Sequence, residues 1–217
     1  MATTRGRADG DLLRHPRRAT VAAASMLAVL AAMAVLVAAD TAAPPLLFRV
    51  DAWWQGLMLP SPGWAVHASD LLKLLGSGWL MVPLRVGVAG YLLGRKRYAD
   101  LAAWLLGWAL ADLATSLLKP GIGRLRPDGS DFSSFPSGHA KTAAQVAVGM
   151  VLVLTSPWRS RMLPWTLALA WIIAMAASRT VLNEHYLSDV VAGTLLGTGC
   201  AVLAAAGVQR ARDKRAA

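Results

Sequence analysis

The 217-residue sequence has very little of the chemistry on which metal and disulfide sites depend. Its single cysteine, Cys200, lies in a run of Ala, Gly, Val and Leu, so it can form neither an internal disulfide nor a thiolate metal cluster. The four histidines are His15, His67, His139 and His185, and none belongs to a closely spaced set of His, Cys and carboxylate ligands. We therefore expect no metal site and no cofactor.

Acidic residues are also scarce, since 12 Asp and Glu stand against 22 Lys and Arg, for a net charge of +10. A basic chain could bind nucleic acid, but the Lys and Arg residues gather at the ends of apolar runs and no soluble basic domain carries them. With 56% hydrophobic residues, the chain is too apolar for an ordinary soluble domain. We expect an all-α polytopic membrane protein whose partner is the lipid bilayer, with no nucleic acid.

Six apolar runs can cross a hydrocarbon core of about 30 Å, which takes about 20 helical residues. A cleaved signal peptide is the alternative for the first run, but its apolar part is longer than the usual signal core. Proline and glycine at 120–121 are expected to stop the third helix. The pattern predicts one bundle of six transmembrane helices, over residues 20–39, a stretch within 64–94, 99–118, 137–154, 163–178 and about 187–208.

The segment between the first two crossings is rich in proline and contains Trp53 and Trp54, which favours an interfacial stretch with a short helix around residues 50–58. The predicted organisation is a disordered basic cytoplasmic tail (1–19), the first transmembrane helix with the interfacial segment (20–63), a helical core (64–208) and a basic cytoplasmic tail (209–217).

Basic residues also predict the orientation of the chain in the membrane. The two tails and the turns at 95–97 and 159–161 are the basic segments, and even numbers of predicted crossings separate them. All four therefore fall on one face, which the positive-inside rule makes the cytoplasm of a plasma (inner) membrane protein. The loop after the third crossing and the join between the fifth and sixth must then meet on the opposite face.

That first outward loop is suited to an anion. Three cations and the glycines at 121 and 123 precede a Pro-Ser-Gly sequence that opens the next helix, where free backbone N–H groups and the helix dipole favour phosphate. A histidine follows at once and can carry a proton near neutral pH. The alternative is a basic surface loop that contacts lipid headgroups. The residues concerned are Lys119, Arg124, Arg126, Ser137, Gly138 and His139.

The second outward stretch decides between these interpretations. His185 and Asp189 are four residues apart at the start of a helix, so the carboxylate can accept one imidazole N–H and leave the other ring nitrogen free for attack. Arg179 adds a cation on the same face. Helix capping could explain the pair, and snorkelling could explain the arginine. Neither explains why histidines and cations collect on the face that should be poor in positive charge, so we favour a phosphoryl-transfer site.

These residues, in this order and spacing, resemble the three-part signature of the type 2 phosphatidic acid phosphatases, which vanadium-dependent haloperoxidases share. The resemblance covers residues 64–208 and implies a helical phosphatase core and a metal-independent lipid phosphatase working through a phosphohistidine. Arg124 lies outside the core signature, where a fourth cation could help. The implied roles are His185 as nucleophile, Asp189 as its orienter, His139 as the acid for the leaving oxygen, and Lys119, Arg126, Arg179, Ser137 and Gly138 as phosphate ligands.

Two other functions fit parts of the pattern. A haloperoxidase would share the signature, but those enzymes are soluble; a lipid or ion transporter would need polar residues through several helix centres, which here are apolar apart from Arg85 and Asp112. The resemblance implies a lipid phosphate as substrate, and the ranking follows what small bacterial members of the family commonly do: first undecaprenyl diphosphate, then phosphatidylglycerol phosphate or phosphatidate.

Arg85 and Asp112 lie at depths that differ by only about 4–5 Å on the second and third crossings. Because an unpaired charge at such depth is costly, we expect an ion pair between them. Separate water-filled pockets are the alternative.

Overall fold

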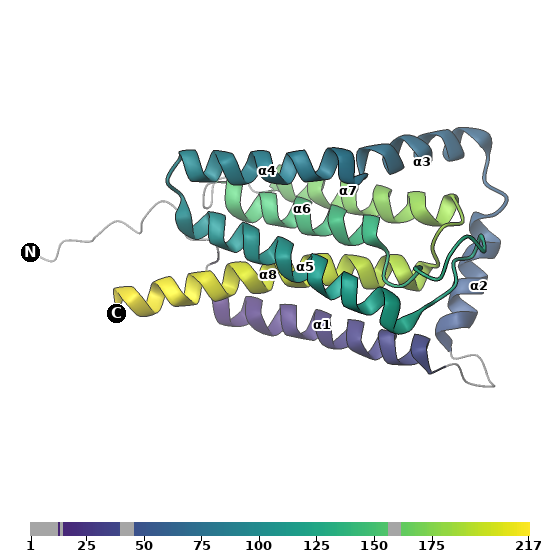
Figure 1. Cartoon of the computed structure of the whole chain (residues 1–217), viewed down its shortest axis with the longest axis horizontal. Coiled ribbons are helices and arrows are strands. Elements are labelled where there is room, and N and C mark those ends of the chain that lie inside the picture. Colours follow the sequence, from purple (N-terminus) through teal and green to yellow (C-terminus); the bar gives the residue numbers. More distant parts are fainter. Residues whose placement is uncertain (1–12, 14, 40–45, 156–161) are drawn as a thin grey trace, which may run out of the picture.

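The computed structural model describes residues 13, 15–39, 46–155 and 162–217, and the regular elements within these ranges are all helices (Figure 1). The predicted all-α class is confirmed. In chain order the helices are α1 (Pro16–Ala38), α2 (Leu46–Met58), α3 (Gly63–Leu75), α4 (Gly78–Gly94), α5 (Tyr98–Ile122), α6 (Gly138–Leu154), α7 (Met162–Val181) and α8 (Leu187–Ala216).

Most of these helices run along the long axis of the molecule, and α2 lies across one end (Figure 1). Their outer faces are apolar, with side chains such as Trp79 89% exposed, as expected of helices that face lipid. Within the described residues four helices are long and apolar enough to span, namely α1, α5, α7 and α8, and α3 with α4 makes a possible fifth. The apolar α6 has only 17 residues. The chain is therefore a multi-pass membrane protein, and the count of six crossings stays a prediction.

The second crossing was expected as one stretch, but it is broken into α3 and α4, which meet at an angle of 45°. At the break, a Cβ on Gly76 would lie 2.5 Å from Met175 Cε and 3.1 Å from His139 Cδ2. A larger residue here would require the flexible Met175 side chain to shift and would crowd His139 in the first turn of α6. The bend therefore brings the end of α3 against His139.

The third crossing does not stop at the proline as expected. Helix α5 includes Pro120 and ends at Ile122; its C-cap is Gly123, whose φ of 60° is left-handed and whose N–H donates to Lys119 O at 3.0 Å. A proline in the last turn costs only one backbone bond, whereas a left-handed glycine ends a helix and satisfies its last carbonyls.

The ends of the chain are more helical than predicted. Helix α1 begins at Pro16, because proline fits the first helical turn, so residues 16–19 are not disordered. The basic tail 209–217 continues α8 as far as Ala216. The short helix expected in the interfacial segment is present and begins four residues earlier than expected, while its position at the membrane interface stays a prediction. The remaining tail, 1–12 and 14, the segment 40–45 and the basic turn 159–161 lie outside the described residues.

Helix α8 is the centre of the bundle and lies directly against α6. A Cβ on Gly193 would lie 2.4 Å from Ser137 O, and one on Gly197 would lie 2.2 Å from Lys141 O. Any larger residue would push the two helices apart. This contact places the first turn of α6, with His139, beside the start of α8.

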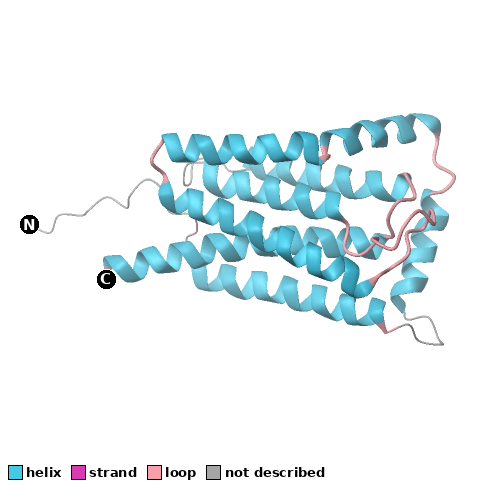
Figure 2. Ribbon diagram, viewed as in Figure 1, coloured by secondary structure: helices cyan, strands magenta, loops and turns pink. Residues whose placement is uncertain are grey.

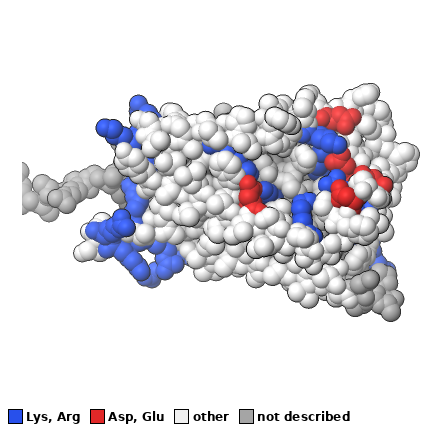
Figure 3. Space-filling model, viewed as in Figure 1, with Lys and Arg blue, Asp and Glu red and all other residues white. Residues whose placement is uncertain are grey.

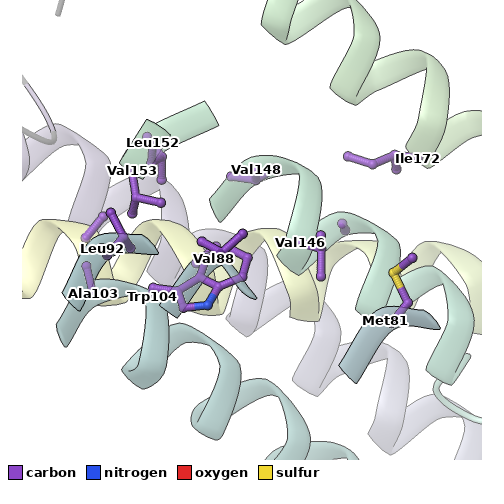
Figure 4. Packing of buried hydrophobic residues seen from close by; sticks show 13 residues of the cluster. Met81, Val88, Leu92, Ala103, Trp104, Val146, Val148, Leu152, Val153 and Ile172 are labelled. Atoms are coloured by element: carbon purple, nitrogen blue, oxygen red, sulfur yellow. The ribbon is translucent and has the colours of Figure 1, made fainter. Parts of the chain in front are cut away.

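Away from that end, the apolar core forms around Trp104, which lies among Val88, Val148 and Leu152 (Figure 4). The indole is 1% exposed and donates its N–H to Arg85 O at 3.0 Å. A Cβ on Gly149 would meet the indole at 2.8 Å. This packing joins α4, α5 and α6.

Candidate active site

The two predicted stretches meet at the end of the bundle where α2 lies, because the α5–α6 and α7–α8 connections both run there (Figure 2). The two connections are bonded to each other. The Ser137 N–H donates to Asp189 O at 3.0 Å, and Ser134 Oγ donates to Asp189 Oδ2 at 2.5 Å. Residues about 50 positions apart in the sequence thus form one cluster.

His185 and Asp189 form the buried pair expected from their spacing. His185 Nδ1 lies 3.7 Å from Asp189 Oδ2, and the two residues are 2% and 0% exposed. The same carboxylate oxygen accepts the Tyr186 N–H at 2.9 Å, so Asp189 also takes part in a capping box at the start of α8. Asp189 can therefore cap α8 and orient His185 at the same time. The other ring nitrogen, Nε2, takes part in none of the hydrogen bonds that the described residues make.

Ser134 completes this arrangement and was missed in the sequence. Its hydroxyl is fully buried, donates to Asp189, and lies 3.4 Å from His185 Nδ1. It can hold the carboxylate in the orientation that faces the imidazole. A serine in a polar run carries no sequence signal that separates it from Ser130 or Ser133.

The electrostatics of the cluster favour a neutral imidazole. Burial lowers the pKa of His185 below its usual 6.5, while Asp189 acts in the opposite direction and does not fully compensate. A ring whose pKa lies below 6.5 is unprotonated at neutral pH, which is the state a nucleophile needs.

The expected cations Lys119 and Arg126 lie on the α5–α6 side. Lys119 Nζ donates to Ser133 O, and Arg126 Nη2 lies 3.3 Å from Ser133 Oγ. Arg126 Nε lies 3.2 Å from Asp131 Oδ1, whose side chain is 46% exposed. Acidic and basic side chains accordingly appear together at this end of the molecule, whereas in the same view only basic ones appear at the opposite end (Figure 3).

Arg179 comes from the last turn of α7 and is completely buried. Its Nη1 bonds Glu184 Oε2 at 3.0 Å, and its Nη2 bonds Ser69 O at 3.0 Å. Glu184 also forms an ion pair with Lys73 of α3. Burial raises the pKa of Glu184, but Lys73 and Arg179 outweigh burial and hold it below the usual value. Glu184 and Lys73 were not predicted, because the contact joins residues 111 positions apart.

The start of α6 presents the groups expected for anion binding. Ser137 is fully buried, and its Oγ is without a hydrogen-bond partner among the described residues. Gly138 and His139 follow in the first turn, where backbone N–H groups point out of the helix. A buried hydroxyl with no partner costs free energy unless a ligand supplies one.

Arg124 has different bonding partners from the other predicted cations. Its Nη1 donates to Asp189 Oδ1 and its Nη2 to Asp51 Oδ2, each at 2.7 Å. The guanidinium therefore lies behind Asp189, between two carboxylates, and this position does not support the predicted role of Arg124 as a fourth phosphate ligand. Asp51, from α2, was not predicted as a site residue.

Within the described part of the chain, no three His, Cys, Asp or Glu side chains come together as metal ligands would. The fold thus defines a class: an all-helical, multi-pass membrane protein with two histidines, a carboxylate and several cations at one end.

Comparison with known proteins identifies the family. Residues 100–213 match the PAP2 superfamily. The chain is 35% identical over 145 residues to phosphatidylglycerophosphatase B of Bacillus subtilis (strain 168), an alignment that covers 62% of this chain and 70% of that protein. It is 36% identical over 121 residues to lipid A 1-phosphatase of Porphyromonas gingivalis, covering 54% of this chain and only 26% of that longer protein.

The fold agrees with this assignment. The crystal structure of the first transmembrane PAP2 type phosphatidylglycerolphosphate phosphatase from Bacillus subtilis aligns with a TM-score of 0.66 at 25% identity, over 89% of this chain and 96% of that one. The chain belongs to the PAP2 superfamily. It is a metal-independent lipid phosphatase of that family.

Proposed function

We propose that the chain removes phosphate from a membrane lipid through a phosphohistidine on His185. His185 Nε2 attacks phosphorus, while the Asp189 carboxylate faces the Nδ1–H, which keeps its proton, and stabilises the imidazolium character that develops. His139 protonates the leaving lipid oxygen, and in the second half it takes a proton from the attacking water. The observation that carries this proposal is the buried His185–Asp189 pair beside the start of α6.

Phosphate would be held by Lys119, Arg126 and Arg179 with Ser137 Oγ and the Gly138 amide. The ion pairs in the site do not prevent this. Arg179 has five N–H donors, of which three are used by Glu184, Ser69 and Ser178. Arg126 is paired with Asp131, a half-exposed side chain that phosphate can displace.

The substrate proposal starts from undecaprenyl diphosphate, the lipid that the family resemblance implies first. The name of the B. subtilis relative supports phosphatidylglycerol phosphate as the second candidate, and the name of the P. gingivalis relative adds the 1-phosphate of lipid A. Phosphate release from these lipids and from phosphatidate, measured side by side with a chelator present, would rank them. A preference for the diphosphate would support the first candidate, and tenfold faster release from a monophosphate would reject it.

The experiment that tests the mechanism is His185→Asn. This change removes the attacking nitrogen and leaves the cations in place, so turnover should fall at least about 10³-fold while binding of vanadate, a phosphate analogue, persists. Wild-type enzyme quenched in base with labelled substrate should retain a phosphoenzyme that acid destroys.

His67→Asn is the matched control, because His67 is an exposed histidine on α3 and its replacement should leave turnover unchanged. Turnover above a few per cent of wild type in His185→Asn would show that another group attacks the phosphorus.

A further inference from the structure

Helix α2 contributes a buried carboxylate to the catalytic end of the bundle. Asp51 is 2% exposed and lies on a helix that precedes the part of the chain matched to the family, residues 100–213. Its Oδ2 accepts a hydrogen bond from Arg124 Nη2 at 2.7 Å. Arg124 Nη1 donates to Asp189 Oδ1, also at 2.7 Å. A continuous chain of charged groups therefore runs from α2 to the carboxylate that faces His185.

Both oxygens of Asp51 are occupied, so its position is well defined. Ser188 donates its N–H to Oδ1 at 2.8 Å and its hydroxyl to Oδ2 at 2.6 Å. The Arg124 guanidinium lies over the Tyr186 ring at 4.0 Å and near the Phe48 ring at 5.1 Å. These contacts restrict the arginine to the plane in which its two Nη groups meet separate carboxylates.

The two oxygens of Asp189 have different partners as a result. Oδ1 accepts a hydrogen bond from Arg124. Oδ2 accepts hydrogen bonds from the Ser134 hydroxyl and the Tyr186 N–H, and it faces His185. If Asp51 were neutral, Arg124 would be attracted to Asp189 alone and would compete with His185 for that carboxylate. Sharing the arginine between two acids limits this competition.

A second contact fastens α2 to the same loop. Gln55 Nε2 donates to Asn183 Oδ1 at 3.0 Å, two residues before His185. Asn183 has a left-handed φ of 55°, so the loop turns sharply at the point where α2 holds it. Helix α2 therefore contacts the loop that carries His185 directly, and it is linked through Arg124 to the carboxylate that faces His185.

We propose that Asp51 is a positioning residue for phosphoryl transfer, acting through Arg124 to orient Asp189 and thereby His185. The proposal rests on the proposed roles of His185 and Asp189. It gives Arg124 a role different from phosphate binding and makes α2 part of the catalytic machinery. Arg124, Tyr186, Asp189 and His185 are titratable groups that face this chain of contacts, and Lys119 and Arg126 add positive charge from the α5–α6 side.

The first test is Asp51→Asn, which is nearly isosteric, keeps an acceptor for the Ser188 N–H and leaves Arg124 paired with Asp189. Outer partners that orient catalytic ligands are worth roughly 10- to 100-fold where measured in metal sites, so we expect kcat to fall by about that factor with KM nearly unchanged. The acid limb of the pH profile should move to lower pH, because the imidazolium of His185 loses support from one nearby carboxylate.

Asp100→Asn is the matched control. Asp100 is equally buried, at 4% exposure, and bonds Arg97 at 2.7 Å at the other end of α5. The Asp100→Asn change should lower thermal stability without moving the pH profile of turnover. An Asp51→Asn enzyme with wild-type kcat and an unmoved acid limb would reduce α2 to a packing element and overturn the proposal.

Arg124→Lys separates positioning from phosphate binding and decides the question if Asp51→Asn does not fold. A lysine keeps the charge but lacks the planar guanidinium whose two Nη groups bond the separate carboxylates. Positioning predicts a lower kcat at unchanged KM and unchanged vanadate affinity. A raised KM with wild-type kcat would instead make Arg124 a phosphate ligand and refute the proposal.

These outcomes are distinct from failure of the proposed function. Turnover in His185→Asn would refute the assignment of His185 as the nucleophile, whatever the Asp51 variants show. An inactive His185→Asn beside a fully active Asp51→Asn would refute only the role of Asp51.

Discussion

Asp189 shows how much one side chain can contribute at the residue scale. It caps α8, faces His185 and pairs with Arg124, and all three contacts exist because it is fully buried at the junction of two loops. The spacing of His185 and Asp189 predicted their contact, since residues four apart share a helix face. The contribution of Ser134 could not be predicted, because it depends on where the α5–α6 loop folds back.

His139 provides the residue-scale prediction. Removing the acid by His139→Ala should slow hydrolysis of lipid substrates by about 10²-fold or more, because the leaving alkoxide must then depart unprotonated. For p-nitrophenyl phosphate, whose leaving group needs little protonation, the loss should be much smaller. Steady-state kcat for the two substrates measures the difference. Equal losses for both would mean that His139 does not act as the acid, and His67→Ala is the control.

At the scale of elements, the ion pair expected between the second and third crossings is confirmed. Arg85 Nη1 lies 3.2 Å from Asp112 Oδ2 and joins α4 to α5. The structure adds Lys141 of α6, which binds the other carboxylate oxygen, and the Trp108 indole, which donates at 2.7 Å. One half-exposed carboxylate thus neutralises two buried cations from different helices. The depths in the membrane expected from the sequence could pair Arg85 with Asp112. The direction in which the Lys141 side chain points depends on how α6 packs and could not be predicted.

This arrangement makes Asp112 more important for stability than either cation. Asp112→Asn leaves two buried cations without a carboxylate, whereas Arg85→Gln leaves Lys141 and Asp112 paired. Breaking a buried ion pair costs about 3–5 kcal/mol; because the Asp112 side chain is 45% exposed, we expect a loss of about 1–3 kcal/mol for Asp112→Asn and less for Arg85→Gln.

Thermal unfolding in detergent would measure both variants and the double variant. The double variant should be more stable than the sum of the single losses predicts, because the two sites interact. Additive losses would contradict the ion pair's energetic role. Asp213→Asn, at an exposed position on α8, is the control.

The whole molecule is asymmetric in charge along its long axis (Figure 3). The described basic segments at one end are the start of α1, the α4–α5 turn and the end of α8, while the predicted site residues lie at the other end (Figure 1). The positive-inside rule makes the basic end cytoplasmic, so we expect the site to open to the non-cytoplasmic face. The substrate would then be a lipid whose phosphate is exposed there.

Thiol labelling in intact cells tests this orientation. In a Cys200→Ala background, a cysteine replacing exposed Ser130 in the α5–α6 loop should react with a membrane-impermeant reagent. A cysteine replacing Ala216 at the end of α8 should react only after permeabilisation. The reverse pattern would invert the topology and exclude an outer-face substrate.

The sequence by itself determined the helical membrane class, the resemblance to the family and the residues that meet at one end, because hydrophobic length, charge bias and motif spacing are local properties of the chain. Tertiary structure decided what those residues contact. In the sequence Arg124 is one more cation in its loop, but packing places it between Asp51 and Asp189. Glycines at 76, 193 and 197 allow close contacts between helices that no local pattern reveals. Such contacts depend on how helices far apart in the sequence pack, and only the folded chain brings these side chains together.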